Sequence, residues 1–159
     1  MAGSAKRDAP APKIMAIASG GGHWIELRRL MPAFADLDVF YVSTDRQADA
    51  DLPEGRYYAV TNVTRRNRFA FLTLTRELAG IIRRERPTVV ISTGAAPGLV
   101  GLILARLFCR SRTLWIDTFS HAESITLSGR LARPFCDAWL VQWAHLAKPG
   151  GPEYWGEIL

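Results

Sequence analysis

A run of three glycines followed by a histidine is the segment of this sequence best suited to chemistry. Gly20, Gly21 and Gly22 follow an apolar run and directly precede His23. Glycines let the backbone approach a ligand closely, and the free amides at the start of a helix attract anions, so the three glycines are candidate phosphate ligands. Histidine side chains titrate near neutral pH, so His23 could serve as a general base. The alternative for His23 is a helix cap or a structural hydrogen bond.

Two further polar segments could bind phosphate or sugar. Thr93, Gly94 and Ala95 begin a second turn of small residues and are a candidate phosphate cradle, although an ordinary strand-to-helix connection has the same composition. The stretch 118–130 is rich in hydroxyl groups and carries Glu123, a candidate catalytic carboxylate on the strength of its position alone. A plain surface loop is the alternative for this stretch.

Cofactor and metal signatures are weak. The glycine turn lacks the GxGxxG spacing of dinucleotide-binding folds and the lysine of nucleotide-binding P-loops, which argues against NAD and ATP. Residues 36–38 (DLD) and 49–51 (DAD) match a DxD metal motif, but neither directly follows a predicted strand. Acidic pairs of this kind arise readily by chance in polar stretches. We therefore expect neither a cofactor nor a metal site.

The elements that must position these residues alternate between strand and helix. Apolar runs predict strands at 13–19, 38–43, 57–60, 88–92, 113–117 and 138–142, and helical spacing predicts helices at 23–34, 68–84, after residue 97 as far as 109, and 128–135. This order predicts an α/β fold, a Rossmann-like parallel sheet with helices on both faces. Ligands of such sheets bind beyond the carboxyl ends of the strands. Segments 20–23, 43–45, 93–97 and 118–124 should therefore converge on one edge.

Length and composition fit a single ordered domain. The chain has 159 residues, of which 48% are hydrophobic and 22% charged, as in ordinary globular proteins. Residues 1–12 are polar and rich in alanine and proline, so we expect a disordered tail followed by one domain over 13–159. The apolar run at 98–109 is shorter than the roughly 20 residues that a membrane span needs.

The net charge of +5 favours anionic partners. Arg65, Arg66 and Arg68 are interleaved with Phe69 and Leu72, a pattern that suits contact with an anionic membrane surface. The alternative is an amphipathic helix that packs on the sheet and exposes its arginines to water. No nucleic-acid recognition motif is present, so we expect no nucleic-acid partner.

The end of the chain is unusually apolar. Tyr154, Trp155, Ile158 and Leu159 lie within its last six residues. Exposed apolar patches commonly mark partner sites, so we expect these four residues to contact a protein partner.

Several motifs resemble those of one known family. They are SGGGH after the first strand, ISTGAAP after a middle strand, and the carboxy-terminal strings LSGR (127–130), CDAWLVQW (136–143) and YWGEIL (154–159). Together they are similar to the Alg14/PssD family of oligosaccharide and exopolysaccharide synthesis, over residues 13 to 159.

This resemblance implies the amino-terminal domain of a GT-B glycosyltransferase such as MurG, which binds a lipid-diphosphate acceptor at the membrane face. It also implies a separate nucleotide-sugar-binding glycosyltransferase subunit, similar to Alg13 or PssE, that holds a UDP-sugar. Gly20–His23 and Thr93–Ala95 would then meet the lipid-linked saccharide acceptor, with His23 deprotonating its hydroxyl. Glu123 falls in a loop where family members often carry an acidic residue.

Two expectations about the whole protein follow from the resemblance. Eukaryotic members begin with a membrane helix, whereas residues 1–12 here are polar, so we expect a cytoplasmic protein attached peripherally to the cytoplasmic face of the membrane. The chain should be inactive without its partner. The alternative is a non-catalytic membrane scaffold that recruits a fully equipped glycosyltransferase, in which case His23 would be replaceable.

Overall fold

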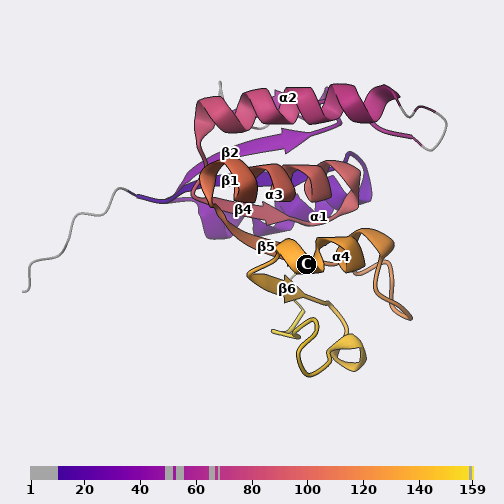
Figure 1. Cartoon of the computed structure of the whole chain (residues 1–159). Helices are drawn as coiled ribbons and strands as arrows, with labels where there is room; N and C mark the ends of the chain where they lie inside the picture. The colour runs from indigo at the N-terminus through magenta and orange to yellow at the C-terminus, as the bar shows by residue number, and fades with distance from the viewer. Residues whose placement is uncertain (1–10, 49–51, 53–55, 65–66, 68, 158) are drawn as a thin grey trace, which may run out of the picture.

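One parallel sheet forms the centre of the molecule (Figure 1). The computed structural model describes residues 11–48, 52, 56–64, 67, 69–157 and 159, and six strands lie within them. They are β1 (Lys13–Ala18), β2 (Asp38–Ser43), β3 (Tyr57–Ala59), β4 (Val89–Ser92), β5 (Arg112–Ile116) and β6 (Ala138–Leu140). Their order is β3-β2-β1-β4-β5-β6, and all neighbours pair in parallel. This confirms the predicted α/β fold.

Helices cover both faces of the sheet, as predicted. One face carries α1 (Gly22–Leu30) and the short 3-10 helix η1 (Met31–Phe34); the other carries α2 (Phe69–Glu85), α3 (Ala95–Cys109) and α4 (Leu127–Ala132). The short helices η2 (Arg133–Phe135) and η3 (Ala144–Leu146) flank β6 in the chain.

Strand β1 shows why the sheet is buried on both sides. Its side chains alternate between the two faces, since the side-chain period of a strand is two residues. Ile14 and Ala16 pack in the core beneath α1, whereas Met15 and Ile17 pack in the core beneath α2 and α3. The continuous apolar run therefore fills two cores at once, as is typical of a central parallel strand.

Helix α1 is shorter than the sequence predicts. Instead of one helix over 23–34, the α-helix ends at Leu30 and the chain continues as the 3-10 helix η1. Pro32 lies in the first turn of η1. Proline has no backbone N–H to donate to the carbonyl four residues earlier, so the α-helical ladder cannot continue through it.

The buried face of α2 differs from the prediction at one position. The helical spacing of the sequence places Phe71 on one face with Leu74, Leu78, Ile81 and Ile82, but Phe71 is 48% exposed, whereas Ala70 is buried. The buried residues are Ala70, Leu74, Leu78 and Ile82, a strict four-residue spacing that leaves the neighbouring Phe71 outside the stripe. The ring of Phe71 is therefore partly exposed to solvent.

No helix in the described part of the chain combines the length and apolar character that crossing a bilayer requires. Helix α3 is the most apolar of the set, with 15 residues from Ala95 to Cys109. Its inner side packs against β1, β4, β5 and α2.

Candidate functional site

Four loops at the carboxyl ends of the strands are joined by hydrogen bonds. After β1, the Gly20 N–H donates to Thr44 Oγ1, which follows β2, over 2.8 Å. His23 contacts the Thr93 carbonyl after β4, and Glu26 accepts a hydrogen bond from Thr118 after β5. The predicted convergence of these segments on one edge of the sheet is confirmed.

The glycine turn opens helix α1 to solvent. Gly21, the N-cap of α1, has a φ of +72°, a left-handed conformation that glycine adopts without steric cost. Gly21 and Gly22 are exposed, and no side chain among the described residues caps the first turn of the helix. The first amides of α1 are therefore available to an anion. The phosphate-binding role of Gly20, Gly21 and Gly22 stays a prediction.

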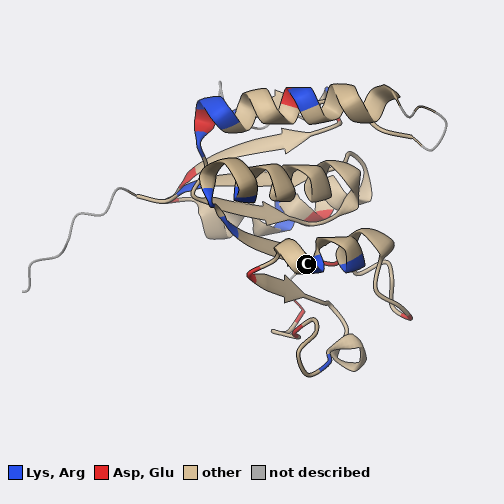
Figure 2. Ribbon diagram, in the orientation of Figure 1, with Lys and Arg blue, Asp and Glu red and all other residues tan. Residues whose placement is uncertain are grey.

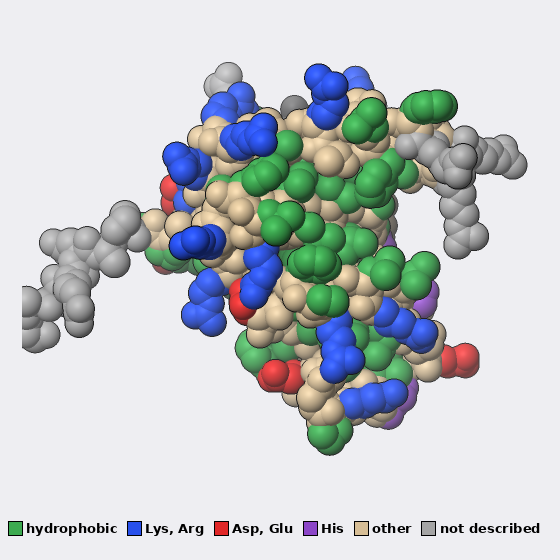
Figure 3. All heavy atoms as spheres, viewed as in Figure 1, with side chains coloured by type: hydrophobic (Ala, Val, Ile, Leu, Met, Phe, Trp, Pro, Cys, Tyr) green, Lys and Arg blue, Asp and Glu red, His purple; other side chains and the backbone are tan. Residues whose placement is uncertain are grey.

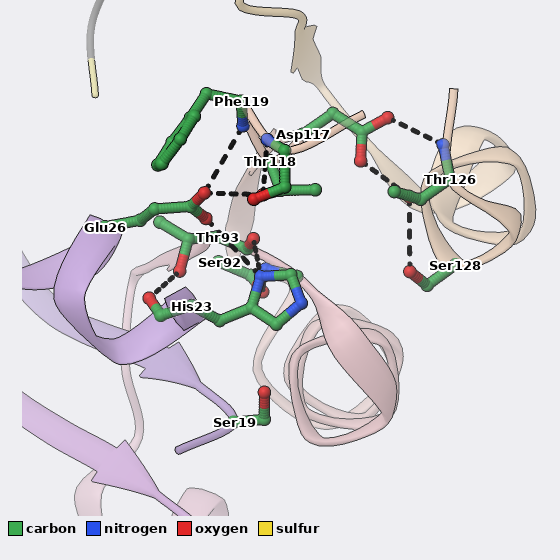
Figure 4. A network of polar contacts seen from close by, with 12 residues as sticks. Ser19, His23, Glu26, Ser92, Thr93, Asp117, Thr118, Phe119, Thr126 and Ser128 are labelled. Atoms are coloured by element: carbon green, nitrogen blue, oxygen red, sulfur yellow. Dashed lines mark hydrogen bonds and ion pairs between the residues drawn. The ribbon is translucent and has the colours of Figure 1, made fainter. Parts of the chain in front are cut away.

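His23 and Thr93 are cross-linked by two hydrogen bonds (Figure 4). His23 Nδ1 lies 3.0 Å from the Thr93 carbonyl oxygen, and the Thr93 hydroxyl donates to the His23 carbonyl over 2.8 Å. A carbonyl oxygen only accepts, so Nδ1 carries a proton in this contact, and in the neutral ring the lone pair is then on Nε2. The side chain of His23 is partly exposed. The ring is thus held in the tautomer that leaves Nε2 able to accept a proton.

Gly94 provides the space for this ring. A Cβ atom at Gly94 would lie 2.8 Å from His23 Cε1 and 2.9 Å from Nδ1, and the φ of Gly94 is +134°. Gly94 is also the N-cap of α3, and within the part of the chain that the structure describes no side chain caps the start of that helix. The second turn therefore seats the histidine through Thr93 and Gly94. The phosphate-binding role of Thr93, Gly94 and Ala95 stays a prediction.

Glu26 belongs to this cluster and is absent from the residues that the sequence singles out. Its side chain is 1% exposed. Oε1 accepts hydrogen bonds from the Thr118 hydroxyl and from the Phe119 N–H, and Oε2 lies 3.4 Å from His23 Nδ1. One signal could have revealed it: Glu26 follows His23 by three residues, so both lie on one side of the helix, and its neighbour Leu27 is a core position.

The hydroxyl-rich stretch after β5 is organised by Asp117. This buried carboxylate accepts from both the N–H and the hydroxyl of Thr126, and the Thr126 hydroxyl in turn accepts the Gly129 N–H at the start of α4. Glu123, in the same stretch, is exposed. Among the described residues it shares no hydrogen bond or ion pair with His23, so its catalytic role stays a prediction.

The other predicted contact residues lie away from the polar cluster or outside the described residues. Arg65, Arg66, Arg68 and Ile158 fall outside them, whereas Phe69 and Leu72 lie exposed on the first turn of α2. Tyr154 and Trp155 are exposed near the end of the chain. Leu159 instead packs against the core beneath α1, and its N–H donates to Gln142 Oε1.

Comparison with known proteins places the chain in a family. The family model described as oligosaccharide biosynthesis protein Alg14 like matches residues 56–158. A UDP-N-acetylglucosamine transferase subunit ALG14 from Eremothecium gossypii is 28% identical, over 87% of this chain and 76% of the relative. The protein of the same name from Yarrowia lipolytica is 23% identical, over 86% and 76%.

Solved structures share the fold at low sequence identity. MurG from Acinetobacter baumannii has a TM-score of 0.69 and 14% identity, over 89% of this chain and 44% of MurG. A UDP-N-acetylglucosamine 2-epimerase from Rickettsia bellii has a TM-score of 0.66 and 13% identity, over 86% and 40%. The chain thus spans less than half the length of these two proteins and shares the fold of MurG, as predicted. On the family match, this chain belongs to the Alg14-like family of oligosaccharide biosynthesis proteins.

Proposed function

We propose that this chain is the acceptor-binding subunit of a two-subunit glycosyltransferase that moves a sugar from a UDP donor to a lipid-linked saccharide. The names of the relatives favour N-acetylglucosamine as the sugar. One observation carries the enzymatic part of the proposal: His23 is held by the Thr93 carbonyl with Nε2 left to accept a proton, at the sheet edge where such folds bind ligands.

The reaction needs a base at the acceptor hydroxyl. In the proposed step, Nε2 of His23 takes the hydroxyl proton while the acceptor oxygen attacks the anomeric carbon of the donor sugar. The bond from that carbon to the UDP oxygen breaks, and UDP leaves with the electron pair. The uncapped starts of α1 and α3, at Gly21 and Gly94, would place backbone amides beside the acceptor diphosphate. A partner subunit of the Alg13/PssE kind would hold the UDP.

The acceptor lipid requires a membrane-facing surface, and the candidate is the face of the molecule that carries α2, α3 and α4. Figure 3 shows hydrophobic side chains gathered over α2, α3 and α4, with basic side chains around them. Phe69 is 87% exposed at the start of α2 and Leu127 is 71% exposed on α4. We propose that this face rests on the cytoplasmic surface of an anionic membrane, where apolar insertion and cationic attraction act together.

The arginines at the end of α2 lie far from the apolar residues at its start. Arg83 lies 14 residues along the helix from Phe69, or about 21 Å at 1.5 Å per residue. In Figure 2 the basic positions at the end of α2 that leads into β4 lie away from the start of the helix. Arg83 and Arg84 are therefore separated from the apolar start of α2, and basic residues near α4, such as Arg130 and Arg133, are better placed beside Leu127.

The exposed aromatic residues near the chain end suit a protein partner. Trp155 is 60% exposed, and Tyr154 is exposed beside it. Large aromatic side chains are enriched in protein–protein interfaces. We propose that Tyr154, Trp155, Ile158 and Leu159 contact the nucleotide-sugar-binding subunit, with Leu159 also holding the segment against the core.

Reconstitution tests the proposal. The purified chain, alone and with the co-expressed partner subunit, is given radiolabelled UDP-N-acetylglucosamine and a polyisoprenyl-diphosphate-linked saccharide. We expect transfer only with both subunits, and His23→Ala in the pair should lower kcat about a hundredfold with little change in the apparent acceptor KM. Circular dichroism and co-purification with the partner confirm that the variant is folded and assembled.

Each other outcome has a distinct meaning. Transfer by the chain alone would refute the two-subunit arrangement. A raised acceptor KM that His23→Lys partly restores would make His23 a phosphate ligand instead of the base. Unchanged kcat and KM in His23→Ala would leave the scaffold alternative.

A further inference from the structure

We propose that Glu26 is a positioning residue for His23: its buried carboxylate keeps the imidazole proton on Nδ1 and so presents Nε2 as the base. The inference rests on the proposed function, because it assigns a role in preparing the same histidine. Glu26 itself does not have to touch the acceptor or the donor.

The burial of Glu26 needs an explanation. A carboxylate removed from water is costly unless hydrogen bonds replace its hydration. Oε1 has such bonds, from the Thr118 hydroxyl and the Phe119 N–H. Oε2 is buried and has no hydrogen-bond partner among the described residues. Oε1 alone links α1 to the loop after β5, so the structural link does not account for Oε2.

A titratable side chain close to Oε2 explains its place. Oε2 and His23 Nδ1 are 3.4 Å apart, and the Thr93 carbonyl lies 3.0 Å from the same nitrogen. Nδ1 therefore faces two oxygens that can only accept. A lone pair on Nδ1 would point at both of them, whereas an N–H satisfies one and is attracted by the other. The tautomer with the proton on Nδ1 is the one that this environment favours.

The carboxylate also acts during proton transfer. When Nε2 accepts a proton, the ring becomes positively charged, and the Thr93 carbonyl contributes only a dipole. In its ionised form, Glu26 supplies a full negative charge 3.4 Å from Nδ1. A buried carboxylate behind the far nitrogen of a general-base histidine performs this orienting and charge-stabilising task in hydrolytic triads.

The local sequence makes the pair rigid. His23 and Glu26 are three residues apart on α1 and lie on the same side of it. Glu26 lies between the buried residues Trp24 and Leu27, which anchor this side of the helix in the core. Carboxylate and imidazole are therefore held by one helix as well as by the loops around it.

The substitution Glu26→Gln tests the inference on the isolated chain. The shape is kept, and the glutamine oxygen should stay with the Thr118 hydroxyl and the Phe119 N–H. Its NH₂ then replaces Oε2 and donates toward Nδ1, which favours a lone pair there and a proton on Nε2. We expect ¹⁵N-histidine NMR at alkaline pH, where the ring is neutral, to show the proton of His23 on Nδ1 in the wild type and shifted toward Nε2 in the variant.

Matched variants keep the NMR result interpretable. His23→Gln identifies the resonance. Asp36→Asn removes one exposed carboxylate and should leave the tautomer unchanged. Thr118→Val keeps the Glu26 charge but removes one of its anchors, so it should shift the tautomer less than Glu26→Gln does. If Glu26→Gln fails to fold, a partial shift of the His23 proton toward Nε2 in folded Thr118→Val supports the positioning role, and an unchanged tautomer contradicts it.

The reconstituted pair separates this inference from the proposed function. We expect Glu26→Gln to lower kcat about tenfold or more while the acceptor KM changes little. An unchanged His23 tautomer in folded Glu26→Gln would overturn the positioning role. A shifted tautomer with an unchanged kcat would support the positioning role and refute His23 as the base.

Discussion

Gly94→Ala should damage the site and the fold together, because the added methyl group enters the place of the His23 ring. The new Cβ would lie 2.8 Å from Cε1 and 2.9 Å from Nδ1 of His23, well inside van der Waals contact. The residue would also have to keep a φ of +134° and a ψ of −173°, a region that only glycine adopts readily. Either the ring or the turn must move.

The stability cost has two parts. A residue other than glycine in this backbone region costs about 1–3 kcal/mol. Displacing the ring removes the contact between Nδ1 and the Thr93 carbonyl, a net loss of about 0.5–1.5 kcal/mol. Together these predict a loss of about 2–4 kcal/mol, or a fall in Tm of roughly 5–15 °C for a chain of this size.

Gly80→Ala is the matched control. Gly80 lies in the interior of α2, and a Cβ there meets nothing within 4 Å. Alanine is the better helix former by about 0.5–1 kcal/mol, so this variant should raise the Tm by a few degrees. The same chemical change is thus expected to have opposite signs at the two positions.

Thermal unfolding followed by circular dichroism measures both variants, and the reconstituted transfer assay measures activity. A displacement of the base by about 1 Å can cost about a hundredfold in rate. Gly94→Ala should therefore show a large fall in kcat even well below its Tm, whereas Gly80→Ala should match the wild type. A Gly94→Ala protein with wild-type Tm and kcat would refute the seating of His23 by Gly94.

Two further predictions concern the rest of the surface. The pKa of Glu85 is lowered mainly by a hydrogen bond from Lys13 and secondly by one from the Tyr58 hydroxyl. The stability that the ionised Glu85 contributes is therefore fully present above its ordinary pKa of about 4.5. This contribution is lost as the pH falls through the lowered pKa. Glu85→Gln should therefore be less stable than the wild type near neutral pH, and denaturant unfolding should show the difference shrinking in acid; a difference that does not vary with pH would contradict the ion pair. Leu127 and Leu131 are both exposed on α4, and replacing them by serine should weaken sedimentation with anionic liposomes about tenfold. The control Leu37→Ser, at an exposed position after η1 on the opposite side of the sheet, should not weaken it. Equal binding to neutral liposomes would rule out the electrostatic part of the attachment.

Local patterns in the sequence were sufficient for the strands and for the edge at which the site lies. The run DVFYVS predicts β2 as observed, over Asp38–Ser43, because an apolar, β-branched and aromatic segment between polar turns has few other uses in a folded chain. The alternation of such runs with helical segments determines a parallel sheet, and a parallel sheet places the turns after its strands at one edge. Gly20–His23 and Thr93–Ala95 could thus be brought together before any coordinates were known.

Only the tertiary structure decided how the site is built. The side chain of Glu26 is buried because the loop after β5, 92 residues along the chain, closes over α1 and donates hydrogen bonds to it. Nothing in the local sequence distinguishes Gly94 from other turn glycines. Its importance comes from the His23 ring, about 70 residues away in sequence, which packs against it. The exposure of Phe71 likewise depends on which neighbouring positions of α2 meet the sheet. Periodicity describes the preferences of one segment at a time, whereas burial, tautomer and close contact depend on the segments that pack against it.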